Sequence, residues 1–308
     1  VPQIYLSAHR SGAYLRVRFT NTATLKVKFD VNRAYFHPYA VLWKIDSGSP
    51  TLLPISTAGV YEIKPIGGFN LSTVYSLQIG GLNWETIVQF RGLQLDAGGK
   101  TVSQNFSKKL IEFIGDSITV GVGSVSVKLG VRGKRGEQLG AEHVQIATAG
   151  ACLTTYGNCI NRSPMEKFYY STRQGSYNFT AWDFKAYTPD AVTIMLGEND
   201  LVSGKVPSAI FTSKYTTFLT KIRAKYPRAH IFALENNSKH FARETLAAVK
   251  ARITAGDGAV SFVDTTGWLG PSDFPPAGGV HPNDAGQLHF ANLLGPIIKK
   301  TLGWSLDT

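Results

Sequence analysis

The sequence lacks several features that mark large classes of protein. It has two cysteines and two methionines among 308 residues. No apolar run approaches the roughly 18 residues that a membrane-spanning helix needs, so we expect no membrane association. Hydrophobic residues make up 43% and charged residues only 17%, a composition that predicts a packed core and excludes wholesale disorder.

Acidic residues are scarce relative to basic ones, with 21 Asp and Glu against 32 Lys and Arg and a net charge of +11. Nucleic-acid binding would call for a basic cluster interleaved with aromatic residues. The densest basic stretch, Lys128 to Arg135, contains no aromatic residue. We therefore expect no nucleic-acid partner, and the surplus charge indicates a solvated surface.

Motifs for bound cofactors and metals are also missing. The sequence has no dinucleotide-binding Gly-x-Gly-x-x-Gly, no phosphate-binding Gly-rich loop and no His-Glu-x-x-His. Cys152 and Cys159 have no Cys or His partners at zinc-finger spacing, so we expect neither a metal nor a cofactor. The two cysteines are either buried thiols or a disulfide, and a disulfide would need an oxidising compartment.

Glycosylation sequons are more frequent than chance predicts, since the composition of the sequence predicts about two. Five stretches fit Asn-x-Ser/Thr, and they begin at Asn70, Asn105, Asn161, Asn178 and Asn236. Together with the cysteine pair, they favour a secreted, extracellular protein from a eukaryote, which we expect to be a fungus.

The chain is long enough for two domains, since a typical domain takes roughly 100–200 residues. Residues 1–105 contain short runs in which apolar and polar residues alternate, as in Leu25-Lys26-Val27-Lys28-Phe29, separated by Gly-rich turns. This period of two predicts an antiparallel β-sandwich, jelly-roll-like in architecture. The predicted strands are residues 13–19, 24–29, 40–45, 59–63, 74–79 and 87–90.

Residues 106–308 follow a different pattern, in which short apolar runs alternate with stretches of helical periodicity. This alternation predicts an α/β domain with a parallel sheet covered by helices on both faces. The predicted strands are residues 110–114, 144–147, 191–196 and 230–234. The predicted helices are residues 208–226, 241–253 and 283–302.

Residues with catalytic chemistry follow the predicted parallel strands, where the sites of such sheets lie. Gly115-Asp116-Ser117 follows the first strand, Gly150 the second and Gly197-Glu198-Asn199-Asp200 the third. His281 precedes the last helix. A serine hydroxyl needs an adjacent base, and His281 is the candidate. Ser117 N–H, Gly150 N–H and the Asn199 amide are candidate oxyanion donors, whereas Asp116 and Asp200 are expected to be structural.

These four blocks, in this order, resemble the SGNH (GDSL-type) hydrolases over roughly residues 108–302. A preceding β-sandwich narrows the resemblance to carbohydrate esterase family 2, whose members remove acetyl groups from xylan and other plant polysaccharides. The resemblance implies a serine esterase without metal or cofactor. Its expected partner is an acetylated plant polysaccharide or oligosaccharide, and the expected oligomeric state is a monomer.

One position departs from the superfamily pattern, which usually has Asp three residues before the histidine. Here that residue is Gly278. The resemblance to family 2 therefore implies a Ser-His dyad in which a backbone carbonyl, of Gly278 or Gly279, orients His281. An aspartate from elsewhere, Asp264 or Asp273, is the alternative.

Other interpretations remain open at this point. Trp268 either stacks on a sugar ring or packs in the core. An SGNH lipase or feruloyl esterase is the alternative within enzymes. A non-catalytic carbohydrate-binding protein is the alternative from another class.

Overall fold

The computed structural model describes residues 14–31, 39–81, 88–103, 109–124, 139–171 and 181–305. The described residues up to 103 belong to one compact unit, and those from 109 onward belong to a second. Among the helices of these ranges, none combines the length and apolar character needed to cross a membrane. The sequons at Asn105 and Asn178 lie outside the described residues.

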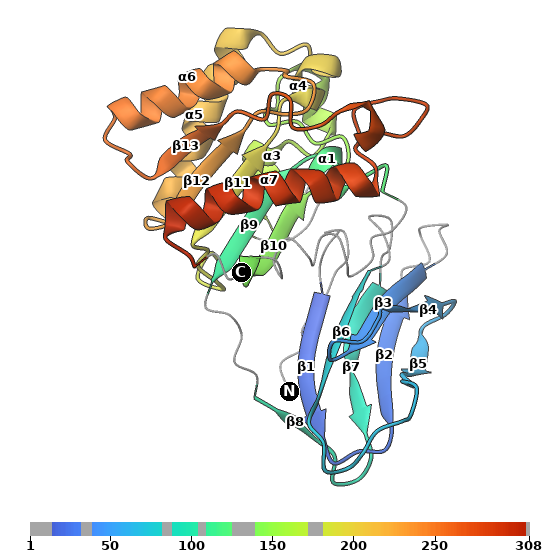
Figure 1. The fold of residues 1–308 in the computed structure, drawn as a ribbon. Helices are drawn as coiled ribbons and strands as arrows, with labels where there is room; N and C mark the ends of the chain where they lie inside the picture. The colour runs from blue at the N-terminus through green and yellow to red at the C-terminus, as the bar shows by residue number, and fades with distance from the viewer. Residues whose placement is uncertain are drawn as a thin grey trace. The chain divides into compact units, whose positions relative to one another are not determined.

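The N-terminal unit consists of two antiparallel sheets, of five strands in the order β4-β3-β6-β1-β8 and three in the order β5-β2-β7 (Figure 1). The strands of the larger sheet are β1 (Tyr14–Thr20), β3 (Tyr39–Ile45), β4 (Thr51–Ile55), β6 (Tyr75–Gly81) and β8 (Lys100–Val102). Those of the smaller sheet are β2 (Leu25–Val31), β5 (Gly59–Glu62) and β7 (Val88–Leu95).

The core of this unit lies between the sheets and follows from the alternating pattern. In β2, Val27 and Phe29 are buried while Lys26 and Lys28 are exposed. Residues of the larger sheet, such as Trp43 in β3, complete the same apolar cluster. The predicted antiparallel sandwich is confirmed, and the lysines of β2 face solvent as expected.

The C-terminal unit is built on a parallel sheet of five strands in the order β10-β9-β11-β12-β13 (Figure 1). Its strands are β9 (Leu110–Gly115), β10 (Glu142–Ala147), β11 (Ala191–Met195), β12 (His230–Leu234) and β13 (Val260–Val263). Its long helices are α5 (Ser208–Lys225), α6 (Ala242–Thr254) and α7 (Asp284–Leu302). Short helical turns are α1 (Ser117–Val120), η1 (Gly157–Asn161), α3 (Met165–Phe168), α4 (Glu198–Val202) and η2 (Pro271–Asp273).

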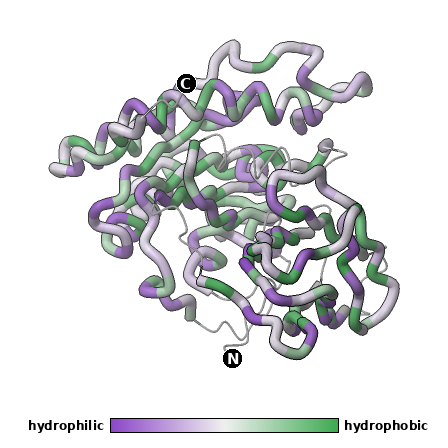
Figure 2. The backbone as a smooth tube through the Cα atoms, turned by 60° about the horizontal axis from the view of Figure 1, so that its bottom comes forward, coloured by the Kyte–Doolittle hydropathy of each residue, from purple (hydrophilic) through white to green (hydrophobic). Residues whose placement is uncertain are grey.

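Helices cover both faces of this sheet, as predicted. Alternate strand residues belong to two separate apolar clusters: Ile114 packs with α5 and α6, whereas Ile111 and Phe113 pack with α7. Polar and apolar residues alternate along the long helices, as expected for helices with one buried face (Figure 2). Because the five strands are parallel, their carboxyl ends meet at one edge of the sheet, where the predicted functional residues lie.

Candidate active site

Ser117 stands at a sharp junction between strand and helix. β9 ends at Gly115, and Asp116 caps α1 because its Oδ1 accepts a hydrogen bond from Ile118 N at 2.9 Å. Any side chain at position 115 would overlap Thr119, so only glycine allows the chain to turn this closely. Ser117 is consequently the first residue of α1, with its backbone N–H at the helix start.

His281 reaches this serine from the loop between η2 and α7. Its Nε2 lies 2.8 Å from Ser117 Oγ, which is a hydrogen-bonding distance. Gly123 passes so close that a Cβ there would lie 2.9 Å from His281 Cβ. The structure therefore brings the predicted nucleophile and the predicted base together across 164 residues of sequence.

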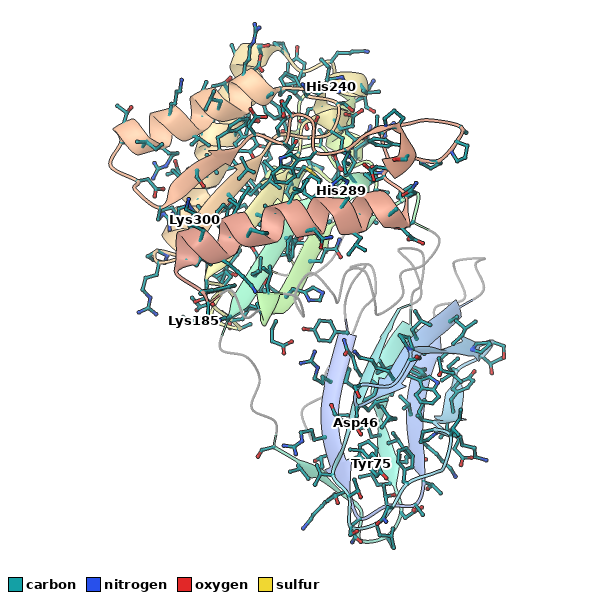
Figure 3. All side chains as sticks on the ribbon, viewed as in Figure 1. Asp46, Tyr75, Lys185, His240, His289 and Lys300 are labelled. Carbon is teal, nitrogen blue, oxygen red and sulfur yellow. A yellow bond between two sulfur atoms is a disulfide. The ribbon has the colours of Figure 1, made fainter. Side chains whose placement is uncertain are left out.

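The other ring nitrogen of His281 finds no hydrogen-bond acceptor in the described part of the chain. Asp273 accepts from Gly270 N at 2.8 Å and contacts His289 Nδ1 on α7 at 3.3 Å (Figure 3 labels His289). Asp264 accepts from Thr266 N at 2.8 Å. Neither aspartate is paired with His281. The described residues likewise contain no hydrogen bond from His281 to the carbonyl of Gly278 or Gly279.

The carboxylate of Glu198, for which the sequence predicts no role, acts on this histidine. Burial lowers the pKa of His281 below its ordinary value, and the charge of Glu198 acts in the opposite direction. Glu198 Oε2 also lies 2.9 Å from His240 Nδ1, without the alignment of a hydrogen bond. The sequence offers one signal that could have pointed to Glu198, which is its position between Gly197 and Asn199 in the third block.

The predicted oxyanion donors lie on three segments. Gly150 has φ = 78°, a conformation that other residues rarely adopt, and it follows β10. Within the described chain, the N–H groups of Ser117 and Gly150 have no acceptor. Asn199 Nδ2 donates to Ala151 O at 3.1 Å and lies 3.4 Å from Asp116 Oδ2. Asn199 thus links the first and second blocks to the third.

Two buried aspartates flank these donors. Burial raises the pKa of Asp116 to about 7, and the charges of Glu198 and Asp200 act in the same direction. Burial also raises the pKa of Asp200 to about 6, against two backbone hydrogen bonds that lower it. These bonds come from Leu153 N at 2.7 Å and Thr154 N at 3.0 Å.

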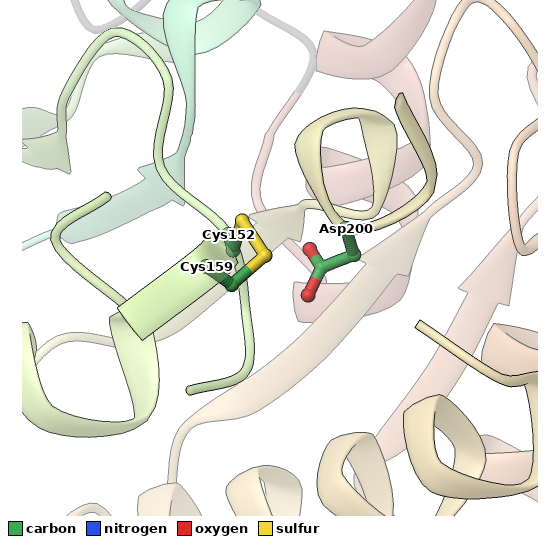
Figure 4. Close-up of side chains that lie close together, drawn as sticks. All are labelled: Cys152, Cys159 and Asp200. Atoms are coloured by element: carbon green, nitrogen blue, oxygen red, sulfur yellow. A yellow bond between two sulfur atoms is a disulfide. The ribbon is translucent and has the colours of Figure 1, made fainter. Parts of the chain in front are cut away.

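Cys152 and Cys159 form a disulfide, which confirms that alternative over free thiols (Figure 4). Its sulfur atoms and the Asp200 carboxylate lie within 4.8 Å of one another. Sulfur atoms in a disulfide cannot act as thiolate ligands, so in this state the group is not a metal site. Figure 4 shows the Asp200 carboxylate pointing from α4 toward the disulfide.

Three of the five predicted sequons lie among the described residues. Asn70 and Asn161 are exposed, whereas Asn236 is only 1% exposed. The Asn236 amide donates to His240 O and accepts from His240 N, so the predicted glycan at this position is wrong for the folded chain.

Trp268 packs edge-on against Phe290 with ring centroids 5.0 Å apart, and this contact favours the core-packing alternative.

The geometry of the site agrees with comparisons to known proteins. The GDSL-like Lipase/Acylhydrolase family matches residues 113–288, more than half of the chain. The chain belongs to this family. The predicted resemblance to SGNH (GDSL-type) hydrolases is thereby confirmed.

A curated relative in the bacterium Acetivibrio thermocellus, the cellulase/esterase CelE, is 28% identical over 237 residues. The match takes in 70% of this chain but only 28% of that relative's length. A family two carbohydrate esterase from Clostridium thermocellum, solved with cellohexaose, has a TM-score of 0.79 at 22% identity, covering 96% of this chain and 94% of that one.

The structure of an acetyl xylan esterase from Butyrivibrio proteoclasticus has a TM-score of 0.78 at 19% identity. The match covers 97% of this chain and 93% of the esterase chain. At these identities the structural likenesses establish the fold, and they extend over both units. An antiparallel β unit followed by a GDSL-like hydrolase unit is therefore an arrangement shared with carbohydrate esterase family 2.

Proposed function

We propose that this GDSL-like chain is a serine esterase that removes O-acetyl groups from plant polysaccharide, such as xylan or glucomannan, or from its oligosaccharides. The observation that carries the proposal is the 2.8 Å approach of His281 Nε2 to Ser117 Oγ. An ester hydrolase needs such a nucleophile and base within hydrogen-bond reach. The names of the relatives, an acetyl xylan esterase and a cellulase/esterase among them, support the substrate class.

The proposed reaction has two halves. His281 Nε2 takes the proton of Ser117 Oγ as the oxygen attacks the acetyl carbonyl, and the imidazolium then protonates the departing sugar oxygen to give the free hydroxyl. The developing oxyanion accepts hydrogen bonds from Ser117 N–H, Gly150 N–H and the Asn199 amide. Water, deprotonated by the same histidine, then attacks the acetyl carbon of the acetyl-Ser117 ester, acetate leaves, and the imidazolium returns its proton to Ser117 Oγ. Asn199 would give up its long contact with Asp116 to donate to the oxyanion.

The proposal extends to the whole chain. Residues 106–308 would be the catalytic domain and residues 1–105 an accessory sandwich, in a monomer. The buried disulfide and the exposed sequons at Asn70 and Asn161 support an extracellular location.

The test follows deacetylation of acetylated xylan and glucomannan by NMR. Ser117→Ala should lower kcat by about 10⁴–10⁶-fold because the nucleophile is lost. Ser261→Ala is the matched control, since Ser261 Oγ lies 3.0 Å from His230 Nε2 in a second Ser-His pair. His230 begins β12, away from the carboxyl edge, so this control should keep full activity. Turnover retained by Ser117→Ala would refute the dyad.

One observation favours a second candidate, an esterase for longer or aromatic acyl groups, such as a lipase or feruloyl esterase. Tyr156, Ile160, Leu201 and Val202 are exposed apolar residues on two neighbouring segments, since Asn158 Nδ2 donates to Ser203 O. An acyl chain could lie against such a surface. A series of 4-nitrophenyl esters decides: kcat/KM rising from acetate to octanoate would replace the acetyl proposal.

A further inference from the structure

Two of the three proposed oxyanion donors, Gly150 and Asn199, follow strands that are not neighbours. Gly150 follows β10 and Asn199 follows β11, and the sheet order β10-β9-β11 places β9 between them. No ladder hydrogen bonds therefore join the two segments. Since oxyanion donors must converge on one atom at about 2.7–3.1 Å, some other contact has to fix their separation.

Asp200 makes such a contact. It follows Asn199 directly on α4 and is fully buried. Each oxygen of its carboxylate takes one backbone N–H of the other segment, Oδ2 from Leu153 at 2.7 Å and Oδ1 from Thr154 at 3.0 Å. Two bonds to two oxygens fix both the distance and the orientation of the loop that begins at Gly150.

The surroundings of Asp200 reinforce the same junction. Ala151, adjacent to Gly150, accepts from Asn199 Nδ2 at 3.1 Å. Cys159 Sγ lies 3.9 Å from Asn199 O, and a Cβ on Gly204 would lie 2.5 Å from the same sulfur. The loop closed by the disulfide is thus packed directly on α4, with the Asp200 carboxylate at the centre of the contact.

We propose that Asp200 is a positioning residue of the oxyanion hole, which acts through Leu153 and Thr154 to hold Gly150 N–H at its working distance from the Asn199 amide. This inference rests on the oxyanion roles assigned to Gly150 and Asn199 in the proposed function. Asp200 touches neither the substrate nor the reacting atoms. Loss of the Asp200 carboxylate should therefore reduce stabilisation of the transition state and leave substrate binding nearly unchanged.

The test variant is Asp200→Asn, which keeps the size of the side chain but turns an N–H toward one of the two backbone donors. A displaced donor should lower kcat about 10- to 100-fold, with KM within a factor of two. The rate at which diethyl 4-nitrophenyl phosphate labels Ser117 should fall in parallel, because the phosphoryl oxygen occupies the same hole. Asp200→Ser, which offers one oxygen on a shorter side chain in place of two and carries no buried charge, provides a second variant if Asp200→Asn folds poorly.

The control is Asp257→Asn, which also alters a buried aspartate that accepts a backbone N–H, from Ala259 at 3.2 Å. It should lower the melting temperature and leave kcat and labelling unchanged. A folded Asp200 variant with wild-type kcat and labelling, or with only KM raised, would overturn the inference. If the wild-type chain is labelled but does not deacetylate sugars, the proposed function fails, and the labelling rates still decide the role of Asp200.

Discussion

At the residue scale, His281 Nδ1 has no aspartate partner in the described structure, so the proposed mechanism needs another group to support the charge of protonated His281. A triad carboxylate normally stabilises the imidazolium. Here the charge that favours it belongs to Glu198, which acts against the lowering of the His281 pKa by burial. Glu198 is itself nearly buried, with 9% of its side chain exposed.

Removing this charge should change the pH profile. The proposed mechanism requires neutral His281, so activity should be present above the pKa of His281 and should be lost as pH falls through that pKa. Glu198→Gln should lower that pKa further, so the acid limb of kcat/KM should move to lower pH, with plateau kcat about tenfold lower. A pH–rate series from pH 4 to 9 measures both.

His240→Gln is the matched control, because His240 Nδ1 lies 2.9 Å from Glu198 Oε2 and its loss leaves the carboxylate in place. Its acid limb should remain where the wild-type limb lies. An unmoved acid limb in Glu198→Gln would show that the charge does not support His281.

At the element scale, the start of α7 holds His281, the proposed base, in place. Asn283, two residues after His281, caps the helix by accepting from Gly286 N at 2.9 Å. Its Nδ2 donates to Ser272 O at 2.9 Å and Phe274 O at 3.1 Å, so the same side chain ties α7 to η2. The loop that carries His281 is thereby anchored at both ends.

Asn283→Ala removes the cap and both amide bonds. Its free energy of unfolding should fall by about 1–2 kcal/mol, and kcat should fall severalfold because His281 loses its anchor. Asn283→Asp keeps the cap acceptor and loses only the donors, so its free energy of unfolding and its kcat should lie between those of the wild type and those of Asn283→Ala. Urea unfolding and kcat at saturating substrate measure these effects, and wild-type values for Asn283→Ala would contradict them.

The same scale separates what the sequence could predict from what it could not. Long periodic elements were predicted within one or two residues, as for α5 and α7. Three strands were missed: β8 has three residues, β13 has four, and β4 contains Pro54. Each lies at the edge of its sheet, where short strands and proline are tolerated and periodicity is weakest.

The site was predictable where chemistry follows a strand end and unpredictable where it depends on packing. Ser117 and His281 could be paired because each stands in a recognisable block. The Asp200 contacts join segments about 46 residues apart that share no strand pairing, so no local pattern reports them. Asn236 shows the converse, since a sequon is a local pattern that burial overrides.

At the scale of the whole molecule, each unit has a core of its own. Leu77 is fully buried in the sandwich and Ile194 is fully buried in the parallel sheet, in separate apolar clusters. A domain with its own core can unfold on its own. The two units should then contribute separate thermal transitions.

Large-to-small substitutions in each core test this expectation in the full-length chain. Leu77→Ala and Ile194→Ala should each cost about 2–5 kcal/mol, but in different transitions. Scanning calorimetry should show Leu77→Ala lowering one melting temperature, with deacetylation kept at temperatures where the other unit is folded. A single transition that both variants shift equally would contradict separate unfolding.

The burial of the disulfide has a consequence for when it can form. Cys152 and Cys159 are both 0% exposed, so neither an oxidase nor a small oxidant can reach them once the loop has packed on α4. Oxidation must therefore precede the final packing of this loop. A chain that folds in a reducing compartment would enclose two thiols beside the Asp200 carboxylate, and later exposure to air would not oxidise these thiols to the disulfide. The surroundings of the nascent chain, rather than those of the finished enzyme, thus determine whether this bond exists.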